Sequence, residues 1–414
     1  MWSIPTRRLA DRPCCCSLWI ACADMGPDIA ETASRRGSFI AACIGSALLS
    51  LPYGTTFLLA LSVTEAGGEA VTAGLVISAM APPTLVGAHL SGRLGDRFGL
   101  RRTIALSGIL MALATLGFAI GQGRLEFLLP SSVLLGLGWG MFYLLAPVAV
   151  SDTSTAETVG YRLAILSGSM MAGLGASPII GRGWSASGYP LDAAFLTAAI
   201  GSLIGAILIH LALRTDQPAT GVFPMRVTWP ILRRIVRSPV IVPISMVGLG
   251  GAMFGSLSSF QSVYAASRDL DYAMFFIAFL GATIGCRLFA ARLVLNYDFR
   301  LTAALLYGLA ALAIGSFALL VGGSLAYVIT SAVLGVGYGL SYSVVNAWAA
   351  ARSPDGLVRQ TLLVFGLCYF VGSLGFPYIA GIAIGAIGVE PMLGLLAGLL
   401  LINILLALAQ RGRG

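Results

Sequence analysis

The sequence contains no lysine, only two histidines and few charges of either sign. Charged residues make up 10% of the 414 positions, whereas 57% are hydrophobic; a soluble domain has about 25% charged residues. So few charges cannot cover the surface of a water-soluble protein of this length. This argues against a soluble enzyme, a nucleic-acid-binding protein and a disordered chain. The formal net charge of +8 therefore bears on orientation in a membrane rather than on binding to nucleic acid.

Patterns for disulfides and metal sites are missing as well. Of the seven cysteines, four lie in the first 22 residues. An odd number with three in a row, Cys14–Cys16, does not form a disulfide framework. Cys43, Cys286 and Cys368 fall in apolar runs, where cysteine behaves as a small buried side chain. With two histidines and no pair of buried carboxylates, we expect no metal, no cofactor and no enzymatic activity.

What the chain has instead is a series of apolar runs of about 20 residues. Each is long enough to cross a hydrocarbon core of about 30 Å as a helix, and the mean hydropathy is +0.91. The runs predict an all-α membrane protein with twelve transmembrane helices. The expected spans are 38–62, 70–91, 103–121, 127–151, 163–182, 191–213, 238–263, 272–292, 301–321, 325–349, 361–383 and 391–409.

Two polar segments divide these runs. Residues 1–36 are an Arg-bearing tail, in which the apolar stretch around Cys14–Cys16 is too short to cross a membrane. A solvated tail is the preferred interpretation, and a signal peptide, lipidation and a start at Met25 are the alternatives. Residues 214–237 form the longest internal polar segment. They predict a linker between one six-helix bundle at 37–213 and another at 238–414.

The 25 arginines are placed asymmetrically along this pattern. With a cytoplasmic N-terminus, 21 of them fall in the tail, in the even-numbered connections with their flanking turns, or at the C-terminal end. Arg287 lies inside the eighth span, and Arg124, Arg182 and Arg268 lie on the other side. Because cytoplasmic connections carry an excess of basic residues, we expect a multi-pass protein of the bacterial inner membrane with both termini in the cytoplasm.

An internal repeat relates the fourth span to the tenth. Residues 132–143 read SVLLGLGWGMFY and residues 331–342 read SAVLGVGYGLSY. Three glycines and a final tyrosine recur at one constant separation. The repeat indicates two six-helix halves related by duplication.

The connection between the second and third spans, GRLGDRFGLRR, resembles the signature loop of the major facilitator superfamily. Glycines allow a tight reversal, and arginines pair with carboxylates or helix C-terminal carbonyls. In place of the family's basic residue after the second glycine stands Leu100. The resemblance implies a cytoplasmic latch that favours the outward-facing state; an anchor obeying the positive-inside rule is the alternative. The motif residues are Gly92, Asp96, Arg97, Gly99, Arg101 and Arg102.

From Gly37 onward the chain resembles the arabinose-efflux and multidrug-efflux-like bacterial permeases of that superfamily. The resemblance implies the major facilitator fold and a monomer that carries a small molecule across the bilayer by alternating access. The fifth span partly matches the glycine-proline pattern of exporters, with Ser177-Pro178 in place of Gly-Pro. We therefore expect export of a small organic molecule, with protons as a candidate coupling partner. Uptake or facilitated diffusion without ion coupling is the alternative, and a non-transporting scaffold is a third.

No carboxylate lies near the middle of a span, and the fourth span lacks the arginine usual in proton-coupled drug antiporters of the superfamily. Proton coupling is therefore an open question. The candidate coupling or charged groups are Asp152, His89, Arg287 and Asp298. Arg287 would bind an anionic substrate or a coupling carboxylate, or else pair with Asp298 or reach the inner interface. For His89, a packing role is the alternative to titration.

By the same resemblance, the first, fourth, seventh and tenth spans line a central cavity. A binding pocket needs apolar walls and a few hydrogen-bonding groups, and polar or aromatic residues of these spans provide both. Packing aromatics are the alternative for the two tyrosines related by the repeat. The expected cavity residues are Tyr53, Thr56, Trp139, Tyr143, Gln261, Tyr342 and Asn346.

Overall fold

The computed structural model describes residues 26–121, 123–152, 154, 158–213, 227–289, 297–319 and 323–410, and within these ranges every regular element is an α-helix. The segment Cys14–Cys16, residues 214–226 of the predicted linker and residues 290–296 lie outside the described ranges.

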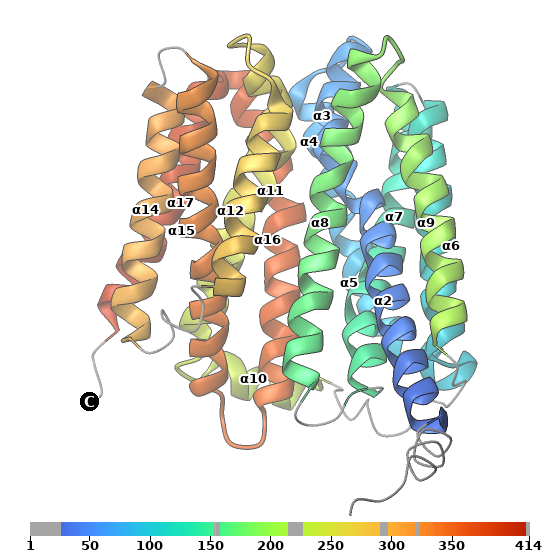
Figure 1. Ribbon diagram of the computed structural model, residues 1–414. Coiled ribbons are helices and arrows are strands. Elements are labelled where there is room, and N and C mark those ends of the chain that lie inside the picture. The colour runs from blue at the N-terminus through green and yellow to red at the C-terminus, as the bar shows by residue number, and fades with distance from the viewer. Residues whose placement is uncertain are drawn as a thin grey trace, which may run out of the picture.

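The described helices run as a bundle of long, roughly parallel rods (Figure 1). Before the linker they are α2 (Gly26–Gly54), α3 (Thr56–Glu65), α4 (Ala70–Ser78), α5 (Ala81–Phe98), α6 (Leu100–Gly121), α7 (Leu125–Asp152), α8 (Val159–Ala186) and α9 (Asp192–Ala212). After it come α10 (Trp229–Val236), α11 (Ile241–Ala266), α12 (Tyr272–Phe289), α14 (Phe299–Leu319), α15 (Ser324–Ala351), α16 (Val358–Ile387) and α17 (Val389–Ala409).

Within the described residues, eleven helical stretches are long and apolar enough to cross a membrane, and a shorter apolar helix, Tyr272–Arg287, occupies the eighth predicted span. Large apolar side chains are exposed on the outer faces of these helices at spacings of three and four residues, as in a helix that faces lipid. In α9 they are Leu196, Ile200, Leu203, Ile204, Ile207 and Leu211. The prediction of an all-α membrane protein is confirmed.

The first two spans are each interrupted, which the apolar pattern did not predict. Pro52 in the last turn of α2 lacks a backbone donor, and the Thr55 hydroxyl donates to the Pro52 carbonyl at 2.7 Å where α2 ends and α3 begins. In the second span, α4 ends at Ser78 and α5 begins just before Pro82 and Pro83. Prolines are well tolerated in a first turn, so they favour a new helix start there.

The signature motif is mostly helical, which corrects the expectation of a loop between the second and third spans. Helix α5 continues to Phe98, so Gly92, Asp96 and Arg97 lie in its last turns, and α6 begins at Leu100. Gly99 alone makes the reversal, with φ of +81°, a value that glycine adopts without steric cost. Continuing the helix keeps its backbone groups hydrogen-bonded, which explains why no longer loop forms.

The repeated glycines have equivalent neighbours in the two halves. A Cβ at Gly136 would lie 2.5 Å from the Met80 carbonyl oxygen beside α5, and one at Gly138 would lie 2.7 Å from the Ser107 carbonyl oxygen of α6. In the second half, a Cβ at Gly337 would lie 2.9 Å from the Ala310 nitrogen of α14. Helix α7 packs between α5 and α6, and helix α15 packs in the same way between α12 and α14. This is the arrangement expected of duplicated halves.

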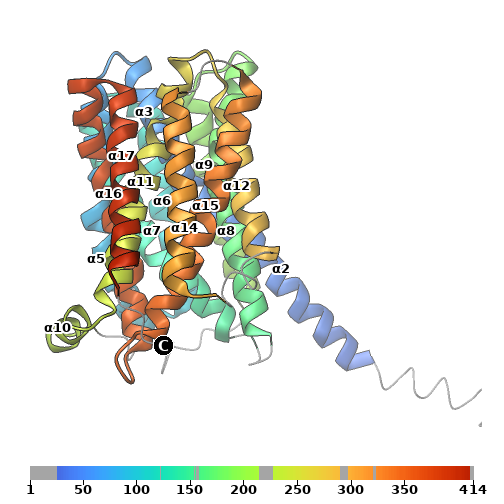
Figure 2. The same ribbon diagram turned by 90° about the vertical axis from the view of Figure 1, so that its left-hand side faces the viewer.

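Helices α2 to α9 pack mainly among themselves, and so do α11 to α17. Contacts between the two groups are made mainly by α4 with α16, α3 with α11 and α8 with α12, and to a smaller extent by α5 with α16. At one end of the bundle, the bottom of Figures 1 and 2, α5 meets α6, α8 begins and α10 lies. We call this the arginine-rich end and the other the opposite end. Among its arginines are Arg93, Arg101, Arg162, Arg233 and Arg352.

Candidate functional site

The two groups of helices meet tightly toward the opposite end through an aromatic cluster. Phe57 of α3 stacks on Phe276 of α12 at 5.3 Å between ring centroids and meets the ring of Phe254 of α11 edge-on at 6.0 Å. Only 2% of Phe57 is exposed. Aromatic pairs at these distances are favourable beyond the area they bury, so the cluster closes the space between the groups.

Two polar contacts join the groups at the same end. The hydroxyl of Ser78, the last residue of α4, donates to the Gly375 carbonyl of α16 at 3.0 Å and accepts from the Tyr378 backbone N–H at 2.9 Å. Arg182 Nε of α8 donates to Asp271 Oδ2 at 3.0 Å, just before α12. Pro377, which lacks a backbone N–H, lies in the same turn of α16.

The groups separate toward the arginine-rich end. At Gly175 of α8, an added Cβ would overlap the Leu280 side chain of α12. Two turns nearer the arginine-rich end, a Cβ on Gly168 would meet nothing within 4 Å. Helices α8 and α12 are therefore in contact at one level and apart at the next.

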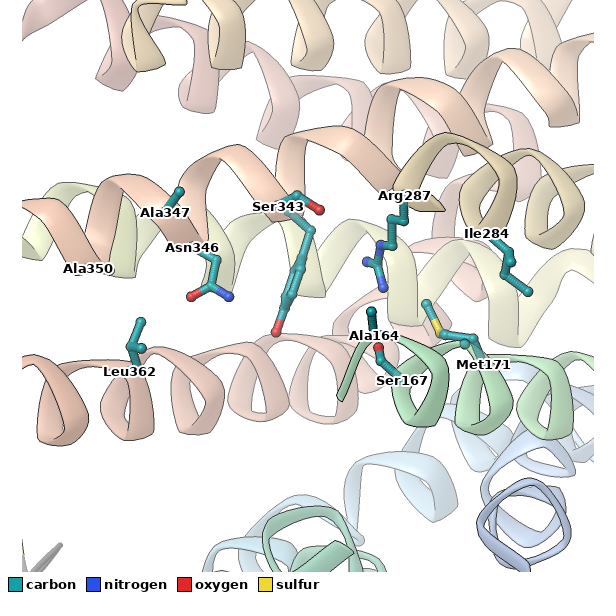
Figure 3. Close-up of a pocket in the computed structure, with 12 residues that line it drawn as sticks. Ala164, Ser167, Met171, Ile284, Arg287, Ser343, Asn346, Ala347, Ala350 and Leu362 are labelled. Carbon is teal, nitrogen blue, oxygen red and sulfur yellow. The ribbon is translucent and has the colours of Figure 1, made fainter. Parts of the chain in front are cut away.

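A cavity of about 450 Å³ lies in this space, lined by α8, α12, α15 and the first turns of α16 (Figure 3). A narrower extension of about 90 Å³ continues it between the groups. We call the two together the central cavity. Residues lining the larger part are Ala164, Ser167, Gly168, Met171, Ile284, Arg287, Tyr342, Ser343, Asn346, Ala347, Ala350 and Leu362.

The extension is walled by rings from both groups. Tyr53 of α2 stacks on Trp139 of α7 at 4.4 Å, and Tyr143 meets Phe370 of α16 at 4.8 Å. The rings of Tyr342 and Tyr369, 5.6 Å apart, continue this aromatic lining. Tyr143 and Tyr342, which the repeat relates, thus both line the extension.

Arg287 reaches this cavity from α12. Its Nε donates to the Gly339 carbonyl of α15 at 3.3 Å, and its guanidinium carbon lies 5.2 Å from the centre of the Tyr342 ring. The side chain is half-buried and lines both parts of the cavity. Figure 3 shows it pointing from α12 toward Ser167 and Met171 of α8.

Asp298 does not pair with Arg287, which removes one of the alternatives for that arginine. It lies just before α14, where Arg300 Nε donates to Asp298 Oδ1 at 3.3 Å. Slight burial raises the pKa of Asp298, but backbone N–H groups of Leu301 and Arg300 and the Arg300 guanidinium donate to the carboxylate and hold its pKa below the usual value. Its local partners therefore keep it charged and away from the cavity.

The expected cavity residues divide into two sets. Tyr53, Trp139, Tyr143, Tyr342 and Asn346 line the central cavity or the small cavity of about 140 Å³ beside it. Thr56 is buried near the opposite end, and the Gln261 amide donates to the Tyr327 hydroxyl at 2.7 Å inside the second group.

The lining also comes from helices that the resemblance did not indicate. The seventh span, α11, packs against α16 instead of lining the cavity, because Gly255 brings its backbone against the Ser373 carbonyl. The fifth, eighth and eleventh spans contribute instead. The small residues Ser167 and Gly168 were the available sequence signal for the fifth span, and the pair Tyr369-Phe370 for the eleventh.

The motif residues lie at the arginine-rich end. Asp96 and Arg97 are exposed, and the Arg97 guanidinium carbon lies 5.4 Å from the centre of the Phe98 ring. Arg101 donates to His210 Nε2 of α9 at 2.6 Å. Arg102 begins α6.

A second cavity, of about 630 Å³, lies between α5, α16 and residues 227–232, and its lining includes His89, Arg93 and Asp96. His89 is exposed there. Asp152 ends α7, but its side chain lies outside the described part of the structure. No group of three or more potential metal ligands gathers among the described residues.

A many-helix membrane bundle with two packed groups, a closed end and a cavity between them defines a membrane transporter rather than an enzyme. A family model for the Major Facilitator Superfamily matches residues 37–377, and the chain belongs to that superfamily.

Known proteins support this assignment. A relative in Burkholderia mallei, described as an uncharacterized MFS-type transporter, is 26% identical over 355 residues, or 78% of this chain and 79% of the relative; a Burkholderia pseudomallei relative has the same values. A solved peptide transporter POT in complex with sulfate aligns with a TM-score of 0.71 and 18% identity, over 90% of this chain and 94% of that one. At that identity the likeness concerns the fold.

Proposed function

We propose that this carrier exports a small organic molecule from the cytoplasm by alternating access. The observation that carries the proposal is the central cavity, which lies between the two groups of helices, reaches toward the arginine-rich end and is closed off from the opposite end by the Phe57 cluster. In an alternating-access carrier, a cavity reachable from one side and sealed from the other is one of the two working states. The proposal places the arginine-rich end in the cytoplasm, following the positive-inside rule.

Support for export comes from α8. Its small residues allow close packing on α2, since a Cβ at Gly173 would overlap the Ala47 carbonyl and the Ser177 hydroxyl donates to the Leu51 carbonyl at 2.7 Å. The partial match of this helix to the exporter pattern thus falls on residues that determine how α2 and α8 move together. The proposal also includes a monomer, a division between the two groups at residues 214–237 and a latch formed by Asp96 in the state that is closed at the arginine-rich end.

Passage without ion coupling is the second candidate, and the cavity lining favours it over proton antiport. None of the described residues that line the central cavity carries a carboxylate. Intramembrane carboxylates are the usual proton sites of transporters. A carrier without one in its cavity would move substrate down the substrate's own electrochemical gradient.

The test begins with a metabolite and drug screen that compares cells with and without the gene. Compounds that accumulate in cells lacking it are then loaded into proteoliposomes of known protein orientation. Export predicts flux from the arginine-rich end outward, with protein-free liposomes as the control. Uptake into cells that express the gene would contradict export. Flux that disappears when an imposed pH gradient is collapsed would overturn the uncoupled candidate in favour of antiport.

A further inference from the structure

The central cavity contains a cation, Arg287, that forms no ion pair with any acid among the described residues. Arg287 lies in a membrane-spanning helix, where an uncompensated charge is expensive, and it donates to one backbone carbonyl and packs against one aromatic ring. A guanidinium has five N–H donors. Among the described residues, only the Nε–H of Arg287 has a recorded hydrogen-bond partner, so the terminal nitrogens are left to the cavity.

Several acids of the described residues are paired with other arginines. In the described residues Asp298 pairs with Arg300, Asp271 with Arg182, and Glu390 with Arg268. These pairs lie outside the central cavity, whose lining includes no acid among the described residues. The positive charge is thus available to a molecule that enters the cavity.

The rest of the lining describes the body of that molecule. The rings of Trp139, Tyr143, Tyr342 and Phe370 form an aromatic wall close to Arg287. Ser167 and Asn346 add a few hydrogen-bonding groups. Such a wall suits a flat apolar or aromatic group. A guanidinium binds a carboxylate through two parallel hydrogen bonds, and one arginine matches a single negative charge better than the double charge of a phosphate monoester.

We propose that the substrate is an organic monocarboxylate. Its carboxylate is bound by Arg287, and its apolar or aromatic body packs against the aromatic wall described above. This inference rests on the proposed transport function but adds the charge and shape of the cargo. It also supplies a driving force without protons, because the membrane potential, negative inside, drives an anion outward by about 2.3 kcal/mol per charge at 100 mV.

The first experiment measures binding to the wild-type protein, independently of transport. Purified protein in nanodiscs is titrated with benzoate, phenylacetate and 3-phenylpropionate, and with the neutral amide of each, by thermal shift. We expect at least one acid to bind at least about tenfold more tightly than its amide, since charge-assisted hydrogen bonds are the stronger ones. Equal binding of acids and amides would overturn the proposal, and so would no binding of any acid at millimolar concentration.

The second experiment assigns the charge to Arg287. Arg287→Gln is expected to lower the affinity for the acid to about the affinity for its amide, and Arg287→Lys to retain part of the preference for the acid. Arg124→Gln is the matched control, because Arg124 is exposed at the opposite end and lies 3.9 Å from Glu126. An acid preference that survives in Arg287→Gln would refute the role of Arg287. Should that variant not fold, Arg287→Lys and the wild-type comparison still decide.

The two proposals fail in different ways. If acids bind through Arg287 but are carried inward, or not at all, export is wrong and the binding site stands. If neutral compounds are exported and acids do not bind, export stands and the monocarboxylate proposal is wrong.

Discussion

Replacing Phe57 by alanine tests whether the aromatic cluster holds the opposite end closed. Phe57 is the member of the cluster that crosses from one group of helices to the other, in two ring pairs with Phe254 and Phe276. Both pairs exist only while that end is shut. Phe57→Ala therefore removes interactions that favour the closed state, and the equilibrium should shift toward opening at this end.

The size of the shift follows from the two pairs. Each aromatic pair contributes about 0.5–1.5 kcal/mol beyond its buried area, so the two together bias the equilibrium by about 1–3 kcal/mol. This corresponds to a change of roughly 5- to 150-fold in the equilibrium constant. A state open at this end and populated to about 1% would rise to between about 5% and 60%.

The assay is a spin-label distance measurement across the opposite end. Labels at Ala66→Cys and Ser267→Cys, both exposed, report on the two groups in a background without the native cysteines. Phe57→Ala should add a longer-distance population.

The matched control is Phe118→Ala. Phe118 is equally buried, and its partner Phe195, at 5.9 Å, lies in the same group of helices. Its loss costs stability in both states and should leave the distances unchanged. Unchanged distances in Phe57→Ala, or an equal shift in the control, would refute the reasoning.

Two further variants test the packing and the latch. Gly255→Ala should destabilise the protein by about 1–3 kcal/mol or more, because the added Cβ would overlap the Ser373 carbonyl. In the control Gly281→Ala the added Cβ would meet nothing within 4 Å, so little effect is expected. Equal melting temperatures of the two variants would contradict this. Asp96→Asn should slow transport without lowering the melting temperature, while Arg97→Lys, which keeps the charge, should slow it less. Wild-type turnover in Asp96→Asn would rule out the latch.

Much of the architecture was predictable from the sequence because a bilayer leaves few choices. In hydrocarbon every backbone group must be paired inside its own segment, so apolar runs of sufficient length become helices. The helix breaks escaped prediction, because a proline such as Pro52 is compatible with either a kink or a break, and Thr55 and the neighbouring helix decide between them. The motif at Gly92–Arg102 was found by its residues, but its shape was misjudged, because glycines indicate where a reversal is possible and not where it occurs.

The candidate site was predictable only in part. Aromatic residues of the repeat, Tyr143 and Tyr342, were indicated by their recurrence, and the cavity includes both. Ser167 and Leu362 were not indicated, since small and aliphatic residues occur throughout the chain and only their neighbours distinguish a lining position from a packed one.

The sequence by itself determined the membrane environment, the number of spans, the duplication and the family, because each depends on composition or on spacing along the chain. Only the tertiary structure decided which helices line the cavity, which end is closed and where Arg287 points. These depend on how closely two helices approach, as at Gly175 and Gly168. The same residue type, glycine, stands at a close helix contact in one case and beside an open space in the other. The difference comes from the neighbouring helix, which belongs to a distant part of the chain.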